Sequence, residues 1–308
     1  MGFILRLTEL NGYSTAVWIL YLSRLWNPKV QGYSFFFSPP DNLEGLSRLS
    51  GVEVSELAKL CHPPAASPNF SNDNLFFGLP VSKFCIRADS PKICPLCLRE
   101  SAYCRKVWDF AAVTVCPAHS VMLLDKCPRC NKRIRWTRKS VCACPCEFDF
   151  RLAEPTPVTG PELSLTEHIH HLCGLPTSDR KSEVGGNNPL LELTLKDCIT
   201  ALLFISGQYR NIRDASGRKI APHKQNSEIH AMLSKAFLVF ADWPRNYFRF
   251  LAWRRNHEAK VSPSDNLMTG LKKDFGIFYY GIFRLLTASQ FDFLRDAFGE
   301  YLSRHWQG

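Results

Sequence analysis

The sequence has no long apolar run and no leader-like start. No stretch approaches the roughly 18 uninterrupted apolar residues that a transmembrane helix needs. The first residues, Met1 to Arg6, lack the basic region, apolar core and small-residue cleavage site of a secretory signal. These absences predict a cytoplasmic protein that has no membrane partner.

The chain also lacks the short signatures of common enzymes. It contains no GxxxxGK[ST] phosphate loop, no G-x-S-x-G nucleophile elbow and no H-E-x-x-H helix. The His-x-Glu that precedes P-C-x-x-C in zinc deaminases is missing as well. We therefore expect a protein without enzymatic activity.

Cysteine, in contrast, is abundant. Thirteen cysteines would indicate a disulfide framework in a short secreted protein, but this chain has 308 residues, the count is odd, and many cysteines are paired with only one or two residues between them. Metal ligation in a reducing compartment explains this spacing better.

Residues 94–146 hold two consecutive sets of four candidate ligands. The first is Cys94-x-x-Cys97 with Cys116-x-x-His119, and the second is Cys127-x-x-Cys130 with Cys144-x-Cys146. A tight turn aims two ligands at one ion, and a second pair completes a tetrahedral shell, so the spacing predicts two structural Zn²⁺ ions. The run Cys142-Ala-Cys144-Pro-Cys146 offers two C-x-C choices, so Cys142 is an alternative ligand.

The charge balance points to a polyanionic partner. The formal net charge is +10, and residues 201–308 carry 16 basic and 9 acidic side chains. Nucleic acid is the commonest such partner, although a solvated basic face is the plainer explanation. The candidate phosphate contacts, all in the C-terminal third, are Arg245, Arg249, Arg254, Arg255, Lys272 and Lys273.

Hydrophobic periodicity predicts a mostly α fold with small zinc-stabilised β knuckles. We expect a buried helix at 14–26, a helix-turn-helix-like pair or an ordinary helical hairpin at 42–60, and a linker at 63–80. Strands are expected at 107–115, 134–136 and 148–150. The C-terminal helices are expected at 189–207, 227–240, 244–256, 276–286 and 289–306. The predicted domains are an N-terminal helical domain (1–85), a tandem zinc-finger module (86–153) and a C-terminal all-α domain (154–308).

The cysteine module resembles the TniQ family, the target-selection proteins of transposons. The resemblance covers Cys94-Pro-Leu-Cys97-Leu, then Tyr103 and Trp108, Val115-Cys116-Pro-Ala-His119, Leu123, and Cys127-Pro-Arg-Cys130. The family's closing C-x-C-G-F-D-L corresponds to Cys144-Pro-Cys146-Glu-Phe-Asp-Phe150, where Glu147 replaces the glycine. The helix-turn-helix-like segment, Trp243-Pro244 with Phe248, and Tyr301 to Trp306 extend the likeness along most of the chain.

The resemblance implies a non-enzymatic adaptor that recruits the AAA+ ATPase TnsC, which in turn brings the transposase. The target would be marked by a guide-RNA-loaded Cascade complex or, as in TnsD-like members, by direct recognition of an attachment site in DNA. A homodimer is a further expectation. The alternative is a sequence-specific DNA-binding protein, such as a zinc-finger regulator, that reads DNA through 42–60.

Overall fold

A computed structural model describes residues 1–26, 33–66, 73–158, 160–176, 187–208, 224–261 and 270–306. The fold is mostly helical with a few short strands, as the sequence predicted. It divides into two compact units, one formed by 1–179 with 220–230 and the other by 180–219 with 231–308. No helix in the described ranges has the length and apolar character needed to cross a membrane.

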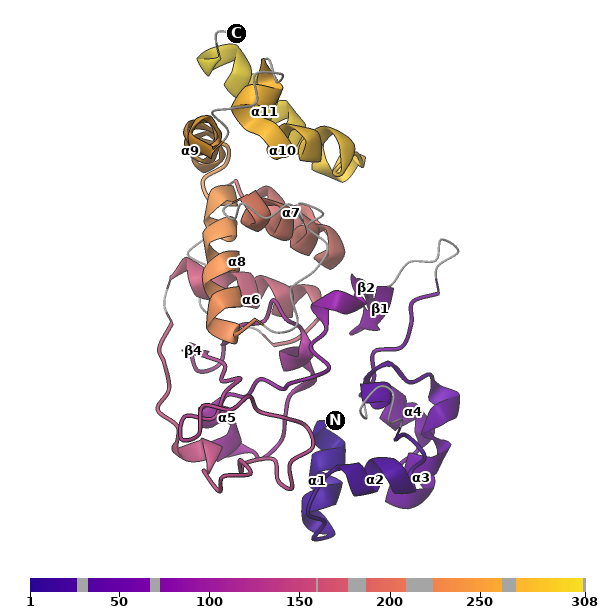
Figure 1. The fold of residues 1–308 in the computed structure, drawn as a ribbon. Coiled ribbons are helices and arrows are strands. Elements are labelled where there is room, and N and C mark those ends of the chain that lie inside the picture. The colour runs from indigo at the N-terminus through magenta and orange to yellow at the C-terminus, as the bar shows by residue number, and fades with distance from the viewer. Residues whose placement is uncertain are drawn as a thin grey trace. The chain divides into compact units, whose positions relative to one another are not determined.

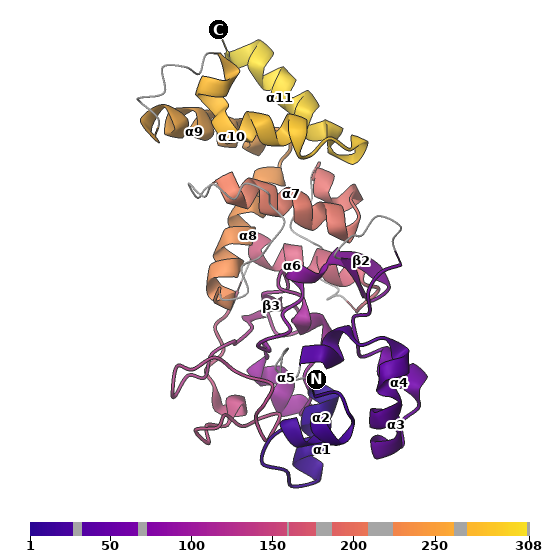
Figure 2. The same ribbon diagram turned by 45° about the vertical axis from the view of Figure 1, so that its right-hand side comes forward.

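The first unit begins with four short helices that lie together in Figures 1 and 2. They are α1 (Gly2–Leu10), α2 (Val17–Leu22), α3 (Glu44–Ser50) and α4 (Val54–Ala58), with 3-10 turns at Tyr33–Phe37 and Pro40–Leu43. Helix α1 was not predicted from the sequence. A Cβ on Gly45 would lie 2.2 Å from the Ser23 carbonyl oxygen, so only glycine allows α3 to approach α2 this closely.

The predicted buried helix at 14–26 is much shorter than expected. Only α2 is helical there, and Arg24 ends the segment in the left-handed conformation with φ 61°. Trp18 and Tyr21 are at least half exposed, so burial of the whole segment was wrong. The pair of helices predicted at 42–60 is present. As expected, Gly51 separates α3 from α4, and it does so in the left-handed conformation with φ 70°. The N-cap of α4 is Glu53, and Ser55 lies inside the helix.

A β-hairpin occupies part of the predicted linker. Strand β1 (Asp73–Phe76) pairs antiparallel with β2 (Leu79–Ser82), and Phe77 and Gly78 turn with positive φ. Buried Phe76 stacks on Phe110, with ring centroids 4.8 Å apart, and on His62 at 5.4 Å. The polar composition of 63–80 masked this hairpin, because its stability comes from one aromatic side chain packed against distant rings.

The long strand predicted at 107–115 does not form. Lys106–Asp109 is a 3-10 helix, and only Val115–Cys116 is a strand, β3, paired with β4 (Val121–Met122). The Lys92 ammonium is buried and donates to the carbonyl oxygens of Phe110 at 2.7 Å, Ala111 at 3.3 Å and Val113. Neighbouring residues of a strand face opposite sides, so the carbonyls of Phe110 and Ala111, which both meet Lys92 Nζ, do not fit a regular strand. No strands form at 134–136 or 148–150; each segment takes part in loops with isolated bridges nearby.

Two longer helices complete the first unit. Helix α6 (Pro161–Leu172) packs against β3 through Leu163, which clusters with Val115 and Val158. The first turn of α8 (Asn226–Phe240) also belongs to this unit. Asn226 donates through Nδ2 to the carbonyl oxygens of Thr114 (2.7 Å) and Leu123 (2.8 Å), and through its backbone NH to Asp125 (2.8 Å). One buried side-chain amide thus ties the start of α8 to the residues just before β3 and just after β4.

Within the described residues, all regular elements of the second unit are helical. It contains a 3-10 turn at Pro189–Glu192, α7 (Leu195–Gln208), the rest of α8, α9 (Arg245–Val261), α10 (Leu271–Arg284), a 3-10 turn at Ser289–Phe291 and α11 (Asp292–His305). Helices α9, α10 and α11 pack against one another, and their core is aromatic: Phe278 lies near Phe250, Phe298 and Phe204. Gly281 faces Phe204, where any Cβ would clash at 2.2 Å.

Candidate metal centres

The first cluster consists of Cys94, Cys97, Cys116 and His119, whose donor atoms all lie within 4.8 Å of one another. Cys94 is the N-cap of helix α5 (Pro95–Glu100), and its sulfur accepts a hydrogen bond from the Cys97 backbone NH at 3.4 Å. Cys116 ends β3, and His119 lies in the β3–β4 turn. A helix start and a hairpin turn therefore each supply two donors.

The distances within this cluster fit a tetrahedral zinc ion. Zn–S bonds of about 2.3 Å and Zn–N bonds of about 2.0 Å place sulfurs about 3.8 Å apart and sulfur and nitrogen about 3.5 Å apart. His119 Nδ1 lies 3.6, 3.3 and 3.6 Å from the sulfurs of Cys94, Cys97 and Cys116. The Cys97 and Cys116 sulfurs are 3.6 Å apart. The ring nitrogen that faces the sulfurs is therefore Nδ1.

The opposite ring nitrogen of His119 has its own partner. Nε2 lies 2.8 Å from Oε1 of Glu100, the last residue of α5. A carboxylate in this position holds the proton on Nε2 and leaves the Nδ1 lone pair for a metal. Sequence reasoning missed Glu100, because 19 residues separate it from His119 and no local spacing connects them.

The thiols of this cluster cannot all ionise by themselves. The hydrogen bond to Cys116 raises the pKa of Cys97, whereas hydrogen bonds from Cys94 and Cys97 lower the pKa of Cys116. Closely packed thiols share protons in this way because several negative charges in one small volume repel one another. A divalent cation removes that conflict, so the donor chemistry as well as the geometry fits Zn²⁺.

The second cluster consists of Cys127, Cys130, Cys144 and Cys146, again with all four sulfurs within 4.8 Å. The Cys127–Cys146 and Cys130–Cys144 sulfur distances are 3.6 Å and 3.8 Å, close to the spacing around a tetrahedral zinc. The turn after Cys127 is closed by hydrogen bonds from Asn131 N to Cys127 O (2.8 Å) and from Cys127 N to Lys132 O (2.9 Å). This cluster could also hold one metal ion.

The closing turn of this cluster requires an unusual backbone. Glu147 has φ 65°, the left-handed conformation that glycine adopts most readily, and it stands where the family motif has glycine. Its NH donates to Cys144 O at 2.8 Å, so the turn forms despite the substitution. Cys142 is outside the group of converging sulfurs; its backbone instead pairs with Ser140 Oγ and Phe150 N.

Both clusters have four protein donors, a set that fills a tetrahedral shell. A catalytic zinc usually has three protein ligands and one exchangeable position. The chemistry that these donor sets favour is therefore the stabilisation of a fold. The first set joins α5 to the β3–β4 hairpin. The same two segments are also connected by the antiparallel bridge between Ile93, before α5, and Leu124, after β4.

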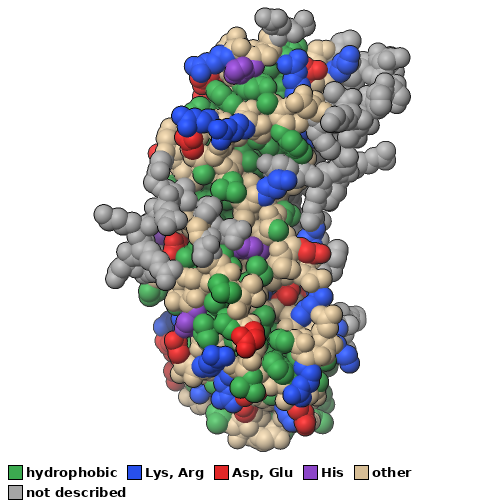
Figure 3. Space-filling view, turned by 90° about the vertical axis from the view of Figure 1, so that its left-hand side faces the viewer, with side chains coloured by type: hydrophobic (Ala, Val, Ile, Leu, Met, Phe, Trp, Pro, Cys, Tyr) green, Lys and Arg blue, Asp and Glu red, His purple; other side chains and the backbone are tan. Residues whose placement is uncertain are grey.

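The candidate phosphate contacts occupy different environments. Arg245 is exposed and pairs with Asp242 at 3.1 Å, and Arg255 pairs with Asp274 at 3.1 Å. Arg254 is only 4% exposed, which leaves little of it for a phosphate. Arg249, Lys272 and Lys273 are exposed. On the face shown in Figure 3, Lys and Arg are interspersed with acidic and apolar side chains and form no continuous basic patch.

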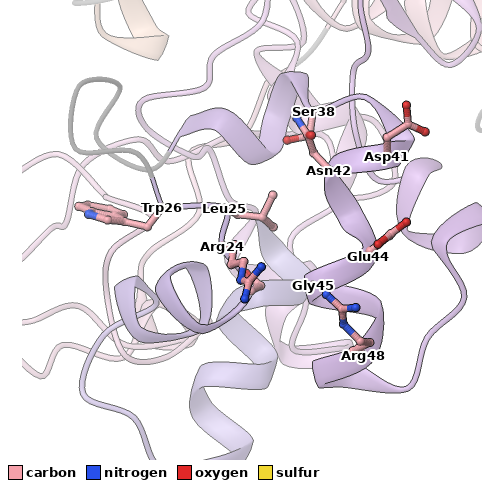
Figure 4. A pocket seen from close by; sticks show the side chains of 10 residues that line it. Arg24, Leu25, Trp26, Ser38, Asp41, Asn42, Glu44, Gly45 and Arg48 are labelled. Atoms are coloured by element: carbon pink, nitrogen blue, oxygen red, sulfur yellow. The ribbon is translucent and has the colours of Figure 1, made fainter.

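A cavity of about 470 Å³ lies in the N-terminal helices. Figure 4 shows its lining, which comes from residues 23–26 just after α2, from residues 38–42 and from α3 itself. Its charged side chains are Arg24, Arg48, Asp41 and Glu44. Two charges of each sign do not select one class of ligand, so the metal clusters remain the clearer candidate sites.

Comparison with known proteins gave one family. The TniQ family model matches residues 1–123. The match includes all four residues of the first metal cluster and ends before the second. No curated protein sequence matches the chain.

Proposed function

We propose that this chain, whose residues 1–123 match the TniQ family model, is a TniQ-family protein and a non-enzymatic target-selection adaptor of DNA transposition. On this proposal the chain is a transposition-associated protein. The adaptor would connect a target-recognition complex to a TnsC-type AAA+ ATPase and so to the transposase. We propose a guide-RNA-loaded Cascade complex as the target-recognition partner, and the chain could also pair with a second copy of itself.

The observation that carries this proposal is the position of the first metal cluster inside the family match. All four of its donors lie between 94 and 119, within the matched residues 1–123. In this proposal Cys94, Cys97, Cys116 and His119 hold one Zn²⁺, and Cys127, Cys130, Cys144 and Cys146 hold another. The bound ions would neutralise the thiolates and fix the loops; the residues themselves position α5 and the β3–β4 hairpin for partner binding.

Reconstitution with the ATPase tests the adaptor. The purified chain is mixed with a TnsC-type ATPase, ATP and duplex DNA, and co-assembly is measured by size-exclusion chromatography with light scattering. We expect the ATPase to retain the chain. The Cys97→Ala variant, which removes a proposed ligand, should not be retained. If the wild-type chain contains two zinc ions and still does not co-elute with the ATPase, the adaptor role is contradicted.

The second candidate is direct reading of an attachment site by the α3–α4 pair. The observation in its favour is Arg48, which is exposed on α3. The outward residues of α4 weigh against it: Glu53 and Glu56 are exposed, and Glu56 pairs with Lys59 at 2.5 Å. A helix that meets phosphates rarely presents carboxylates at its surface. Tight, sequence-selective gel shifts by the isolated chain would favour this candidate over the adaptor.

A further inference from the structure

The loop that carries Cys127 and Cys130 of the second metal cluster has basic but no acidic side chains. Residues 126–139, which we name the basic hairpin, contain no acidic side chain. Its basic side chains are Lys126, Arg129, Lys132, Arg133, Arg135, Arg138 and Lys139. In a net-charge sum over the whole cysteine module, the cysteine thiolates cancel most of this positive charge. In the structure, however, the cysteines are buried or half-buried and several basic side chains lie at the surface.

Two of the basic side chains have structural roles. Arg138 is 2% exposed, donates to the carbonyl oxygens of Arg135 and Val141, and lies over the Trp136 and Phe150 rings. Arg133 pairs with Asp89 at 3.3 Å. The other cations, Lys126, Arg129, Lys132, Arg135 and Lys139, form no ion pair with an acidic side chain in the described part of the chain.

Alternation along the hairpin points these cations outward. Ile134 and Trp136 are each 2% exposed, whereas Arg135 between them is exposed. Side chains in an extended segment alternate between two faces, so the apolar pair anchors the segment and Arg135 faces solvent. Arg129, Lys132 and Lys139 are exposed as well. Of the four cysteines, Cys127 and Cys144 are buried and the other two are half-buried.

The hairpin is also held in place before any partner arrives. Thr15 Oγ1 donates to the Thr137 carbonyl oxygen at 2.6 Å, and Ser140 Oγ donates to Glu9 at 2.8 Å. Arg129 donates to Cys146 O at 3.3 Å. A backbone that is already ordered loses less conformational entropy when it binds, so the cations act as a preformed array. The nearby exposed carboxylates, Glu9 and Glu147, lie beyond the ends of the hairpin in sequence.

We propose that the basic hairpin, through Lys132, Arg135 and Lys139, contacts the phosphate backbone of duplex DNA. This deepens the proposed function, on which it rests for the identity of the partner. The only aromatic residue in the hairpin, Trp136, is buried, so no ring is available for stacking on unpaired bases. Charge without a stacking surface fits a double helix, and phosphate contacts position a protein without selecting sequence.

Salt-dependent binding tests the surface. The triple variant Lys132→Gln/Arg135→Gln/Lys139→Gln is compared with wild type on a fluorescently labelled random-sequence 30-base-pair duplex over a salt series. The slope of log affinity against log salt should fall by roughly 0.9 for each phosphate that the variant no longer neutralises, and affinity should drop about tenfold or more. The matched control, Arg245→Gln/Arg249→Gln/Lys272→Gln, removes the same charge from the second unit and should have a smaller effect.

Each outcome decides the assignment. Equal reductions in affinity for both triples would mean a general charge effect and overturn the proposal, as would an unchanged slope in the hairpin triple. Tighter binding to an RNA duplex of the same sequence would overturn the choice of DNA. Zinc content and the unfolding midpoint confirm that the variants fold; if the triple does not fold, Lys132→Glu alone serves. A wild type that co-assembles with the ATPase but never binds DNA would overturn this inference and leave the adaptor intact.

Discussion

Glu100 and His119 are joined by a 2.8 Å contact between Oε1 and Nε2, while Nδ1 of the same imidazole faces three cysteine sulfurs. The imidazole thus contacts the carboxylate through one nitrogen and the cysteine sulfurs through the other. Glu100 is exposed and His119 is partly shielded. A residue outside the donor set therefore fixes the tautomer of a donor.

Replacing Glu100 with Ala should weaken zinc binding at the first cluster. Removal of an outer carboxylate typically costs about 10- to 100-fold in metal affinity, because the histidine is no longer held in the ligating tautomer and orientation. Competition with a colorimetric chelator measures this. Glu154→Ala, an exposed carboxylate outside both clusters, is the control. Equal affinities in the two variants would show that the Glu100 contact is incidental.

Replacing Cys97 with Ala should remove one of two zinc ions and expose the first cluster to proteolysis. Structural zinc contributes on the order of 10 kcal/mol to folding in finger peptides, so the α5 and β3–β4 region should open. Zinc per chain and limited proteolysis report this. The control is Cys142→Ala, a buried cysteine outside the converging groups, which should retain both ions. Release of an ion from the control would instead make Cys142 a ligand.

Replacing Glu147 with Gly should stabilise the closing turn. A left-handed conformation costs a non-glycine residue roughly 1 kcal/mol, and glycine removes that cost. Glu147→Val should destabilise the turn, because a branched side chain tolerates positive φ poorly. Urea unfolding at saturating zinc measures both variants. Identical midpoints for the two would mean that the turn carries no conformational strain.

Replacing Asn226 with Ala should loosen the β3–β4 hairpin. The Leu123 carbonyl would lose its Asn226 donor, at a cost of about 1–3 kcal/mol, whereas the Thr114 carbonyl would keep the bond from Leu123 N. Hydrogen exchange at the amides of Leu123 and Leu124 should become faster. Asn246→Ala is the control, since Asn246 also donates to two carbonyls but at a more exposed site. Unchanged exchange in Asn226→Ala would contradict the anchoring role.

Acid should destabilise the first unit through His62. Burial lowers the pKa of His62, and the hydrogen bond to Asp109 raises it by less. Below about pH 6.5 the unfolded chain binds a proton that the folded chain does not, so stability falls as pH decreases. Wild type should therefore become less stable more steeply between pH 7 and pH 5 than His62→Gln. Protonation of the metal ligands affects both proteins alike and cancels in this comparison. Parallel stability curves would therefore show that His62 does not contribute to the loss of stability between pH 7 and pH 5.

Local chemistry explains what the sequence could predict. The C-x-x-C and C-x-x-H pairs are set by single turns, so their spacing alone identified the eight donors that the structure brings into two groups. Helices with strong apolar periodicity, such as α8 and α11, were also predicted close to their observed bounds. In these cases the information lies within a few neighbouring residues.

Long-range interactions account for the failures. In place of the strand expected at 107–115, three carbonyls converge on the buried Lys92 Nζ, and the unexpected β1–β2 hairpin packs Phe76 against distant rings. The local sequence pattern indicates only the propensity of a segment to form a strand. It does not show that Lys92, or the rings of Phe110 and His62, will lie next to that segment in the folded protein.

The sequence by itself determined the donor types, their pairing in turns and the surplus of positive charge. Only the tertiary structure decided which carboxylate supports His119 and which cations remain at the surface. Net charge sums over a segment, whereas a partner meets only the charges that burial and ion pairing leave exposed. Arg138 and Lys132 are six residues apart, yet one closes a buried turn and the other faces solvent.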